Sequence, residues 1–243
     1  MSPASEIPPA GVFLRAEWRH LLMMSWAVDP GLLRRAIPHG TELDDYAGEC
    51  WVSLVGFRFL GTRVLGIPIP GHQNFDEINL RFYVRRRGPA GWERGVVFLR
   101  ELVPRRAIAW VARTCYHEPY RAVPMKSTIT DHAVDYRWHL GGRWNRIALA
   151  MDGLPITPNP DSRDGWLAEH YWGFTPQPNG GTLAYRVEHP PWQLRSGHAP
   201  VIDADLATTY GSTWAEALTG PPASTFIAEG SPITVSHGRR LPR

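Results

Sequence analysis

Short runs of alternating polar and apolar residues, separated by Gly and Pro, dominate the chain from Glu49 onward. Successive side chains of a strand point to opposite faces, so this rhythm is typical of a β-rich domain. The clearest run is DEINLRFYVR, residues 76–85, in which Ile78, Leu80, Phe82 and Val84 share one face. Such a face must be buried, and the sequence therefore predicts a sheet that packs on or closes on itself.

Further runs of this kind predict the remaining strands: WVSLVGFRF, GVVFLREL, AIAWVARTCY, the lysine-containing segment AVPMKSTIT, AVDYRWHL, RWNRIALAMD and TLAYRVEH. The pair Gly141-Gly142 between two of them predicts a hairpin. Short helices are predicted after Asp29, around residues 164–172, and near residues 203–210. Roughly eight antiparallel strands with marginal helices indicate a mainly β fold (β-rich α+β), either a barrel or a strongly curved sheet, although a sandwich fits the pattern too.

A chain of 243 residues with ample apolar content is expected to form one domain, which we place at residues 13–218. Residues 1–12 are predicted to be a flexible N-terminus, and the Pro-, Gly- and Ser-rich residues 219–243 a C-terminal tail. A barrel of this size can enclose one small ligand. A small molecule is therefore the expected partner, and assembly into a homo-oligomer stays open.

The composition argues against several other classes of protein. The net charge of +3 is small for a surface that follows phosphates, and the arginine clusters at 85–87 and 105–106 adjoin predicted turns, so no nucleic acid is expected. The longest apolar stretch, LLMMSWAV, is too short to span a bilayer, and the two cysteines suit a reducing compartment. We expect a cytoplasmic protein without membrane contact. No metal-ligand spacing or nucleotide fingerprint occurs, so neither a metal nor another cofactor is expected.

The second face of residues 76–85 carries the candidate site residues Glu77, Asn79, Arg81 and Tyr83. Neighbouring members of this row lie about 6.5 to 7 Å apart and can share one ligand. The row is either an ordinary solvated surface or the lining of a polar pocket. In the second case Glu77 could transfer a proton and Arg81 could bind a carboxylate.

Lys126, in AVPMKSTIT, is the only lysine of the chain. A buried lysine loses its proton readily and can attack a carbonyl, whereas arginine stays charged. Lys126 is therefore either a nucleophile or a product of arginine-biased codon usage. Arg113 and Tyr116, in the segment before it, are further candidates for substrate binding. His189, in EHPPWQL, could form one lip of a cavity or simply end a strand.

Four segments carry a resemblance to a known family: residues 25–59, FDEINLRFYVRRRGPAGWERGVVFLREL, ARTCYHEPYRAVPMK and YRVEHPPWQL. In order and spacing they resemble the YqjF-like family of unknown function, within the acetoacetate decarboxylase-like fold, over about residues 13–200. The resemblance implies a cone-like, closed antiparallel β-barrel with a central cavity. It implies that Glu77 matches a strand glutamate and that Lys126 falls near the Schiff-base lysine of acetoacetate decarboxylase. The lysine pair of that motif is Met125-Lys126 here.

Two functions follow as expectations. The first is a metal-free, lyase-type enzyme that acts on a small carbonyl or carboxylate compound, with Lys126 and Glu77 as catalytic residues. Its substrate would contact Asn79, Arg81, Tyr83, Arg113, Tyr116 and His189. The second is a non-catalytic barrel that binds a small molecule as a sensor or carrier.

Overall fold

The computed structural model describes residues 11–242, which form a mainly β structure with a few short helices. The strands are β1 (Val12–Val28), β2 (Glu42–Leu43), β3 (Cys50–Val64), β4 (Ile67–Pro68), β5 (Phe75–Gly88), β6 (Gly91–Val103), β7 (Tyr120–Ala122), β8 (Met125–Ile129), β9 (Ala133–Leu140), β10 (Arg143–Ile156), β11 (Trp172–Pro176), β12 (Thr182–Glu188), β13 (Leu194–Asp203), β14 (Ser224–Ser236) and β15 (Arg239–Arg240). The helices are α1 (Pro30–Leu33), continued by a 3-10 turn (Arg34–Ala36), α2 (Arg106–Cys115), α3 (Arg163–Ala168), α4 (Leu206–Tyr210) and α5 (Ser212–Ala217).

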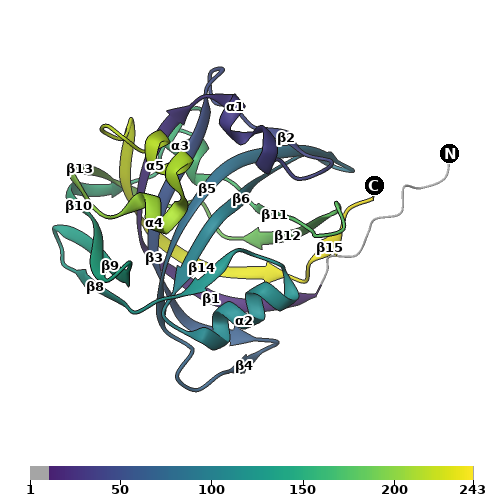
Figure 1. The fold of residues 1–243 in the computed structure, drawn as a ribbon, viewed down its shortest axis with the longest axis horizontal. Helices are drawn as coiled ribbons and strands as arrows, with labels where there is room; N and C mark the ends of the chain where they lie inside the picture. Colours follow the sequence, from purple (N-terminus) through teal and green to yellow (C-terminus); the bar gives the residue numbers. More distant parts are fainter. Residues whose placement is uncertain (1–10, 243) are drawn as a thin grey trace.

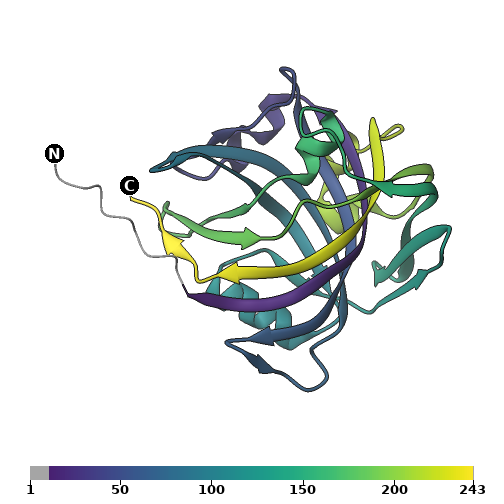
Figure 2. The ribbon, with the colours of Figure 1, turned by 180° about the vertical axis from the view of Figure 1, so that it is seen from behind.

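The strands form one sheet in which neighbours follow the order β12-β11-β6-β5-β3-β1-β14. An additional pairing of Val187 and Glu188 in β12 with Val235 and Thr234 in β14 joins the two ends of this series into a ring. Strands β13, β10, β9 and β8 continue outward from β14. The long strands of the ring curve around the molecule in Figures 1 and 2, and the β8–β9 hairpin lies apart from them on one side.

The alternation predicted for residues 76–85 is confirmed, because both faces of β5 are used and both are buried. Ile78, Leu80, Phe82 and Val84 join a core formed with β3, β9 and β10. The opposite face of the same sheet packs against a second core that contains Phe57, Phe59, Phe75, Trp192 and Phe226. The sheet thus separates two apolar regions, and the second region adjoins the cavity described below.

Several local predictions are confirmed. Asp29 caps α1 by accepting a hydrogen bond from the backbone N–H of Gly31 at 2.8 Å, and Pro30 occupies the first helical position. The predicted hairpin at Gly141-Gly142 joins β9 to β10, with Leu140 opposite Arg143. Helix α4 falls within the predicted range 203–210, whereas α3 begins one residue before the predicted range 164–172 and ends at Ala168, and Trp172 already begins β11.

The segment AIAWVARTCY was predicted as a strand but forms the helix α2. Its apolar residues fit the period of a strand as well as that of a helix. Ile108, Trp110 and Ala112 alternate as in a strand, while Ile108, Val111 and Ala112 recur at helical spacing. The helix is formed because it turns Ile108, Val111 and Ala112 toward the cavity and leaves Trp110 exposed.

The predicted C-terminal tail also differs from the structure. Within residues 219–243, β14 pairs with β1 from Ser236 back to Ser224, and its Phe226, Ile227 and Ala228 are buried. Of the predicted flexible N-terminus, residues 1–10 lie outside the described residues, and Val12 begins the long strand β1. Between residues 11 and 242, no helix combines the length and the apolar character that crossing a membrane requires.

Candidate functional site

A cavity of about 220 Å³ lies against the inner face of the ring, where α2 covers part of it. Its walls are largely aromatic and aliphatic, because the strands of the ring turn apolar side chains inward. The aromatic wall consists of Phe13, Trp18, Phe57, Phe59, Phe75, Phe98, Trp172 and Trp192. A hollow of this size and lining suits a small molecule with an apolar body.

Three of the predicted site residues lie together in this cavity. Glu77, Asn79 and Arg81 occupy the inner face of β5, and their residues are only 2%, 1% and 7% exposed. The alternation of β5 places them there, since it sends Ile78 and Leu80 to the opposite core. The row is therefore the lining of a buried pocket rather than a solvated surface.

Two further glutamates join Glu77 in the cavity and were not predicted from the sequence. Glu101 comes from β6, directly opposite Asn79, and Glu118 comes from the segment between α2 and β7. Both residues are at most 5% exposed. We refer to Glu77, Glu101 and Glu118 as the glutamate cluster.

Hydroxyl groups on neighbouring elements donate hydrogen bonds to the glutamate cluster. The Tyr120 hydroxyl donates to Glu77 Oε2 at 2.8 Å, and the Asn79 amide donates to Glu77 Oε1 at 3.2 Å. Glu118 Oε1 accepts hydrogen bonds from Thr175 at 2.6 Å and from Tyr185 at 2.7 Å. Glu101 Oε2 is buried and has no hydrogen-bond partner among the described residues.

Burial governs the protonation of the glutamate cluster. It raises the pKa of Glu77 to about 7, against the hydrogen bonds from Tyr120 and Asn79, and it raises the pKa of Glu118 to about 7. Burial, together with the charges of Glu118 and Glu77, also raises the pKa of Glu101 well above its usual value. Near neutral pH the cluster therefore holds protons that it can exchange with a ligand.

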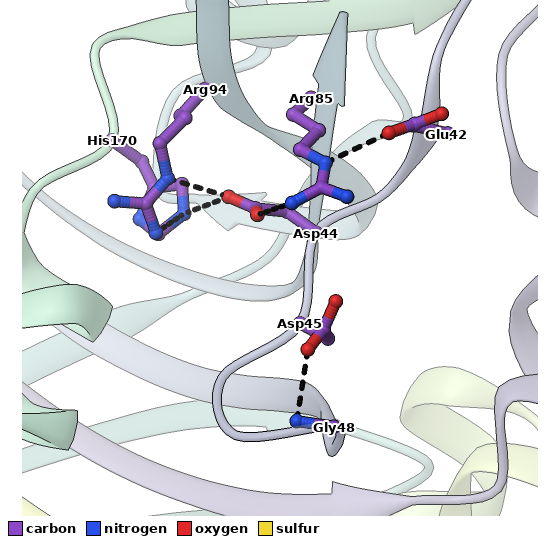
Figure 3. A network of polar contacts seen from close by, with 7 residues as sticks. All are labelled: Glu42, Asp44, Asp45, Gly48, Arg85, Arg94 and His170. Atoms are coloured by element: carbon purple, nitrogen blue, oxygen red, sulfur yellow. Dashed lines mark hydrogen bonds and ion pairs between the residues drawn. The ribbon is translucent and has the colours of Figure 1, made fainter. Parts of the chain in front are cut away.

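A second polar group, which we call the Asp44 network, reaches the cavity through His170 (Figure 3). Arg94 Nε donates to Asp44 Oδ2 at 2.7 Å, His170 Nε2 lies 3.3 Å from the same oxygen, and Arg85 forms an ion pair with Asp44 Oδ1 at 3.6 Å. Arg85 also donates to Glu42 at 2.8 Å. Two arginines and one histidine thus surround one buried carboxylate.

The pKa of the buried carboxyl group in the Asp44 network is lowered, whereas the pKa values in the glutamate cluster are raised. Burial alone would raise the pKa of Asp44, but hydrogen bonds from His170 and Arg94 hold that pKa below its usual value. Burial lowers the pKa of His170 to about 4, assisted by the charges of Arg94 and Arg81. At neutral pH Asp44 is therefore ionised and His170 is neutral.

The structure places the other predicted residues differently. Tyr116 lines the cavity, and its hydroxyl donates to the carbonyl of Ser236 at 3.2 Å. Tyr83 is buried beside the cavity and shares a hydrogen bond with Ser53. Arg113 is exposed on α2 and does not line the cavity. His189 stacks at 4.3 Å on Trp192, a residue of the cavity wall, and so lies behind that wall.

Lys126 does not lie in the cavity. It is exposed on β8, at the outer end of the sheet, and its Nζ atom lies 4.2 Å from the centre of the Trp144 ring. The residues that line the cavity do not include it, so its amine cannot attack a ligand bound there. The expectation that Lys126 forms a Schiff base in the cavity is corrected by this placement.

Among residues 11–242, no group of three or more His, Cys, Asp or Glu side chains is arranged to hold a metal ion. The missed residues Glu101, Glu118 and His170 had no motif to mark them. Glu118 and His170 lie outside the strands, and the position of Glu101 depends on a bulge that the alternation alone does not reveal.

Solved structures of acetoacetate decarboxylase-like enzymes have the same fold. Acetoacetate decarboxylase from Legionella pneumophila subsp. pneumophila str. Philadelphia 1 gives a TM-score of 0.69 at 15% identity, with 99% of this chain and 92% of that chain covered. The enduracididine biosynthesis enzyme MppR, complexed with pyruvate, gives 0.66 at 15% identity, with 99% and 95% covered. An acetoacetate decarboxylase-like enzyme from Sphingomonas wittichii RW1 gives 0.63 at 15% identity, with 99% and 96% covered.

Sequence comparison assigns the family. The protein YqjF of Bacillus subtilis (strain 168), described as uncharacterized, is 33% identical over 217 residues, with 86% of each chain covered. The model of the family DUF2071, described as an uncharacterized conserved protein, matches residues 15–232. The resemblance to YqjF-like proteins is thereby confirmed, and the chain belongs to the DUF2071 family.

Proposed function

We propose that the cavity binds a small carbonyl or carboxylate compound and that Glu77 transfers a proton to or from it. The observation that carries this proposal is the burial of Glu77, Asn79 and Arg81 in one row, inside an otherwise apolar cavity. Arg81 takes part in no ion pair among the described residues, and its Nε atom lacks a hydrogen-bond partner. A carboxylate bound there would supply the missing acceptor. We also interpret the ring of strands as a cone-like, closed barrel around this ligand.

The protonation of Glu77 suits acid–base chemistry. A pKa of about 7 means that both its acid and its base form are populated at neutral pH, which favours proton transfer. We propose that the Glu77 carboxylate removes a proton from the carbon next to the carbonyl group. The C–H electron pair becomes the C=C bond of an enol, and the carbonyl oxygen takes its proton from a protonated glutamate of the cluster. This step opens lyase-type and aldolase-type reactions.

The similar solved structures support the class of ligand. One is acetoacetate decarboxylase, and another, MppR, is complexed with pyruvate. Lysine chemistry is not part of the proposal, because the only lysine of the chain is exposed on β8. That placement also favours a second function, in which the cavity binds the compound and releases it unchanged.

Exchange of the methyl protons of pyruvate for deuterium, followed by proton NMR in D₂O, separates these functions. We expect the wild-type protein to catalyse the exchange and Glu77→Gln to slow it about 100-fold or more. Arg81→Gln should weaken pyruvate binding roughly tenfold or more. Lys126→Ala and the exposed Glu188→Gln serve as controls and should keep the wild-type rate. Thermal stabilisation by pyruvate without any exchange would favour the non-catalytic function.

A further inference from the structure

Two buried polar oxygen atoms on neighbouring strands of the cavity have no hydrogen-bond partner among the described residues. Asn79 on β5 and Glu101 on β6 are directly opposite each other, so their Cβ atoms lie about 4.5 to 5.5 Å apart. Asn79 Oδ1 and Glu101 Oε2 are both buried, and neither has a hydrogen-bond partner among the described residues. Leaving such atoms unmatched is costly, so the pair is complementary to a ligand that donates hydrogen bonds.

The groups that face Glu101 are acidic or neutral. Glu77 on β5 and Glu118 before β7 act on it through their charges, and Tyr120 on β7 lies beside it. Tyr185 on β12 contacts Glu118. Among the described residues that line the cavity, the one arginine or lysine is Arg81, two positions beyond Asn79 on β5. Three carboxyl groups face one guanidinium here, so a cationic ligand would stabilise the ionised form of a carboxyl group that burial otherwise keeps protonated.

We propose that the ligand of this cavity carries a protonated amine, which donates hydrogen bonds to Asn79 Oδ1 and Glu101 Oε2. The apolar body of the ligand then packs against the aromatic wall, where Phe57 on β3 pairs with Glu77 on β5 and Trp18 contacts the Phe57 ring. This inference rests on the proposed function only in taking the cavity as the ligand site. It concerns the nitrogen of the ligand and not the carbonyl chemistry of Glu77.

Binding of an ammonium group is expected to change the protonation of Glu101. Without a ligand, burial and the neighbouring carboxyl groups keep a proton on Glu101. When an ammonium group binds, Glu101 gives up that proton to the solvent and forms a charge-assisted hydrogen bond as the carboxylate. Binding of an amine near neutral pH is therefore expected to release a proton, whereas binding of a neutral molecule of the same shape is not.

Titration calorimetry with 2-phenylethylamine and its neutral counterpart 2-phenylethanol tests the proposal. Measurements at pH 7 in two buffers of different ionisation enthalpy give the number of protons released. For the wild-type protein we expect the amine to bind more tightly than the alcohol and to release about one proton. Equal affinities, absence of amine binding, or amine binding without proton release would overturn the proposal.

Substitutions of Glu101 and Asn79 test whether these two residues account for amine binding and proton release. Glu101→Gln should weaken amine binding about 30-fold and abolish proton release, while it changes alcohol binding little. Asn79→Ala should weaken amine binding but keep proton release. The matched control Glu188→Gln changes an exposed glutamate outside the cavity. An unchanged amine preference in Glu101→Gln would also overturn the proposal. If pyruvate exchange persists while amine binding fails, the proposed function stands and the amine proposal is refuted. If amine binding persists while pyruvate exchange fails, only the proposed function is refuted.

Discussion

The molecule has two buried acidic sites, the glutamate cluster in the cavity and the Asp44 network that reaches the cavity through His170, and their electrostatics are opposite. Asp44 is surrounded by Arg94, Arg85 and His170, and these partners hold its pKa below the usual value against the effect of burial. The glutamate cluster has no comparable partners, since no ion pair among the described residues includes Glu77, Glu101 or Glu118. Its pKa values are raised instead.

The difference separates a structural site from a functional one. A buried carboxylate that is fully paired holds its neighbours in place, because removing it leaves several cations unmatched. A buried carboxyl cluster without cations costs stability, and such a cost is typical of sites that bind or convert a ligand. The first two predictions test this distinction through stability.

The largest effect is expected for Asp44→Ala. The substitution leaves Arg94 and His170 without their common acceptor, and we expect the free energy of unfolding to fall by about 2 to 4 kcal/mol. Urea denaturation at pH 7 measures this loss. The control is Asp203→Ala, which breaks an exposed ion pair with Arg143 and should cost less than about 1 kcal/mol. Equal losses in the two variants would contradict a structural role for Asp44.

Glu118→Gln is expected to raise the free energy of unfolding, whereas Asp44→Ala lowers it. The pKa of Glu118 is about 7 in the folded protein and near 4.5 in the unfolded chain. As the pH rises through this range, the unfolded chain releases its proton first, so the carboxyl group destabilises the folded protein at higher pH. Glutamine cannot lose a proton and can still accept hydrogen bonds from Thr175 and Tyr185.

We therefore expect Glu118→Gln to stabilise the protein by roughly 1 to 3 kcal/mol at pH 8 and to have little effect at pH 4. Urea midpoints measured from pH 4 to pH 8 show whether the difference between variant and wild type grows across this range. Titration of His170 affects both proteins alike and cancels in the difference. A difference that does not depend on pH would contradict the assigned protonation.

The β5–β6 hairpin shows how far the sequence predicts the site. Gly88 pairs with Gly91, and this register continues as far as Arg81 opposite Phe98. A bulge then shifts it by one residue, so that Asn79 faces Glu101 and not Arg100. A shift of one residue exchanges the two faces of a strand. Alternation could thus predict the row on β5, but the placement of Glu101 required the three-dimensional structure.

Other parts of the fold were less predictable for a different reason. The segment 106–115 fits two periods, and only the apolar cavity beneath it selects the helix. The Pro-, Gly- and Ser-rich composition around β14 hides a strand whose Phe226 and Ile227 are buried by partners distant in the sequence. Long-range pairing determined both outcomes, and composition does not reveal it.

A smaller effect is expected for Tyr185→Phe, which removes one of the two donors to Glu118 Oε1. This hydrogen bond favours the ionised carboxylate, so its loss should raise the pKa of Glu118 further. We expect the midpoint of the pH-dependent loss of stability to move to higher pH, with a change of about 1 kcal/mol at pH 7. The control Tyr171→Phe removes a hydroxyl group that contacts Glu169 instead. A midpoint that shifts equally in both variants would show that Tyr185 has no specific role.

The smallest effect is expected for Lys126→Ala, because the ammonium group on β8 contacts the half-exposed Trp144 ring and not the cavity. An exposed cation–π contact contributes about 0.5 to 1 kcal/mol, and that is the expected loss of stability. The double-mutant cycle of Lys126→Ala with Trp144→Ala measures the contact itself. Pyruvate exchange and 2-phenylethylamine binding should stay unchanged in Lys126→Ala, because the amine belongs to neither buried acidic site. Loss of exchange in this variant would reinstate Lys126 as a nucleophile and require β8 to move to the cavity.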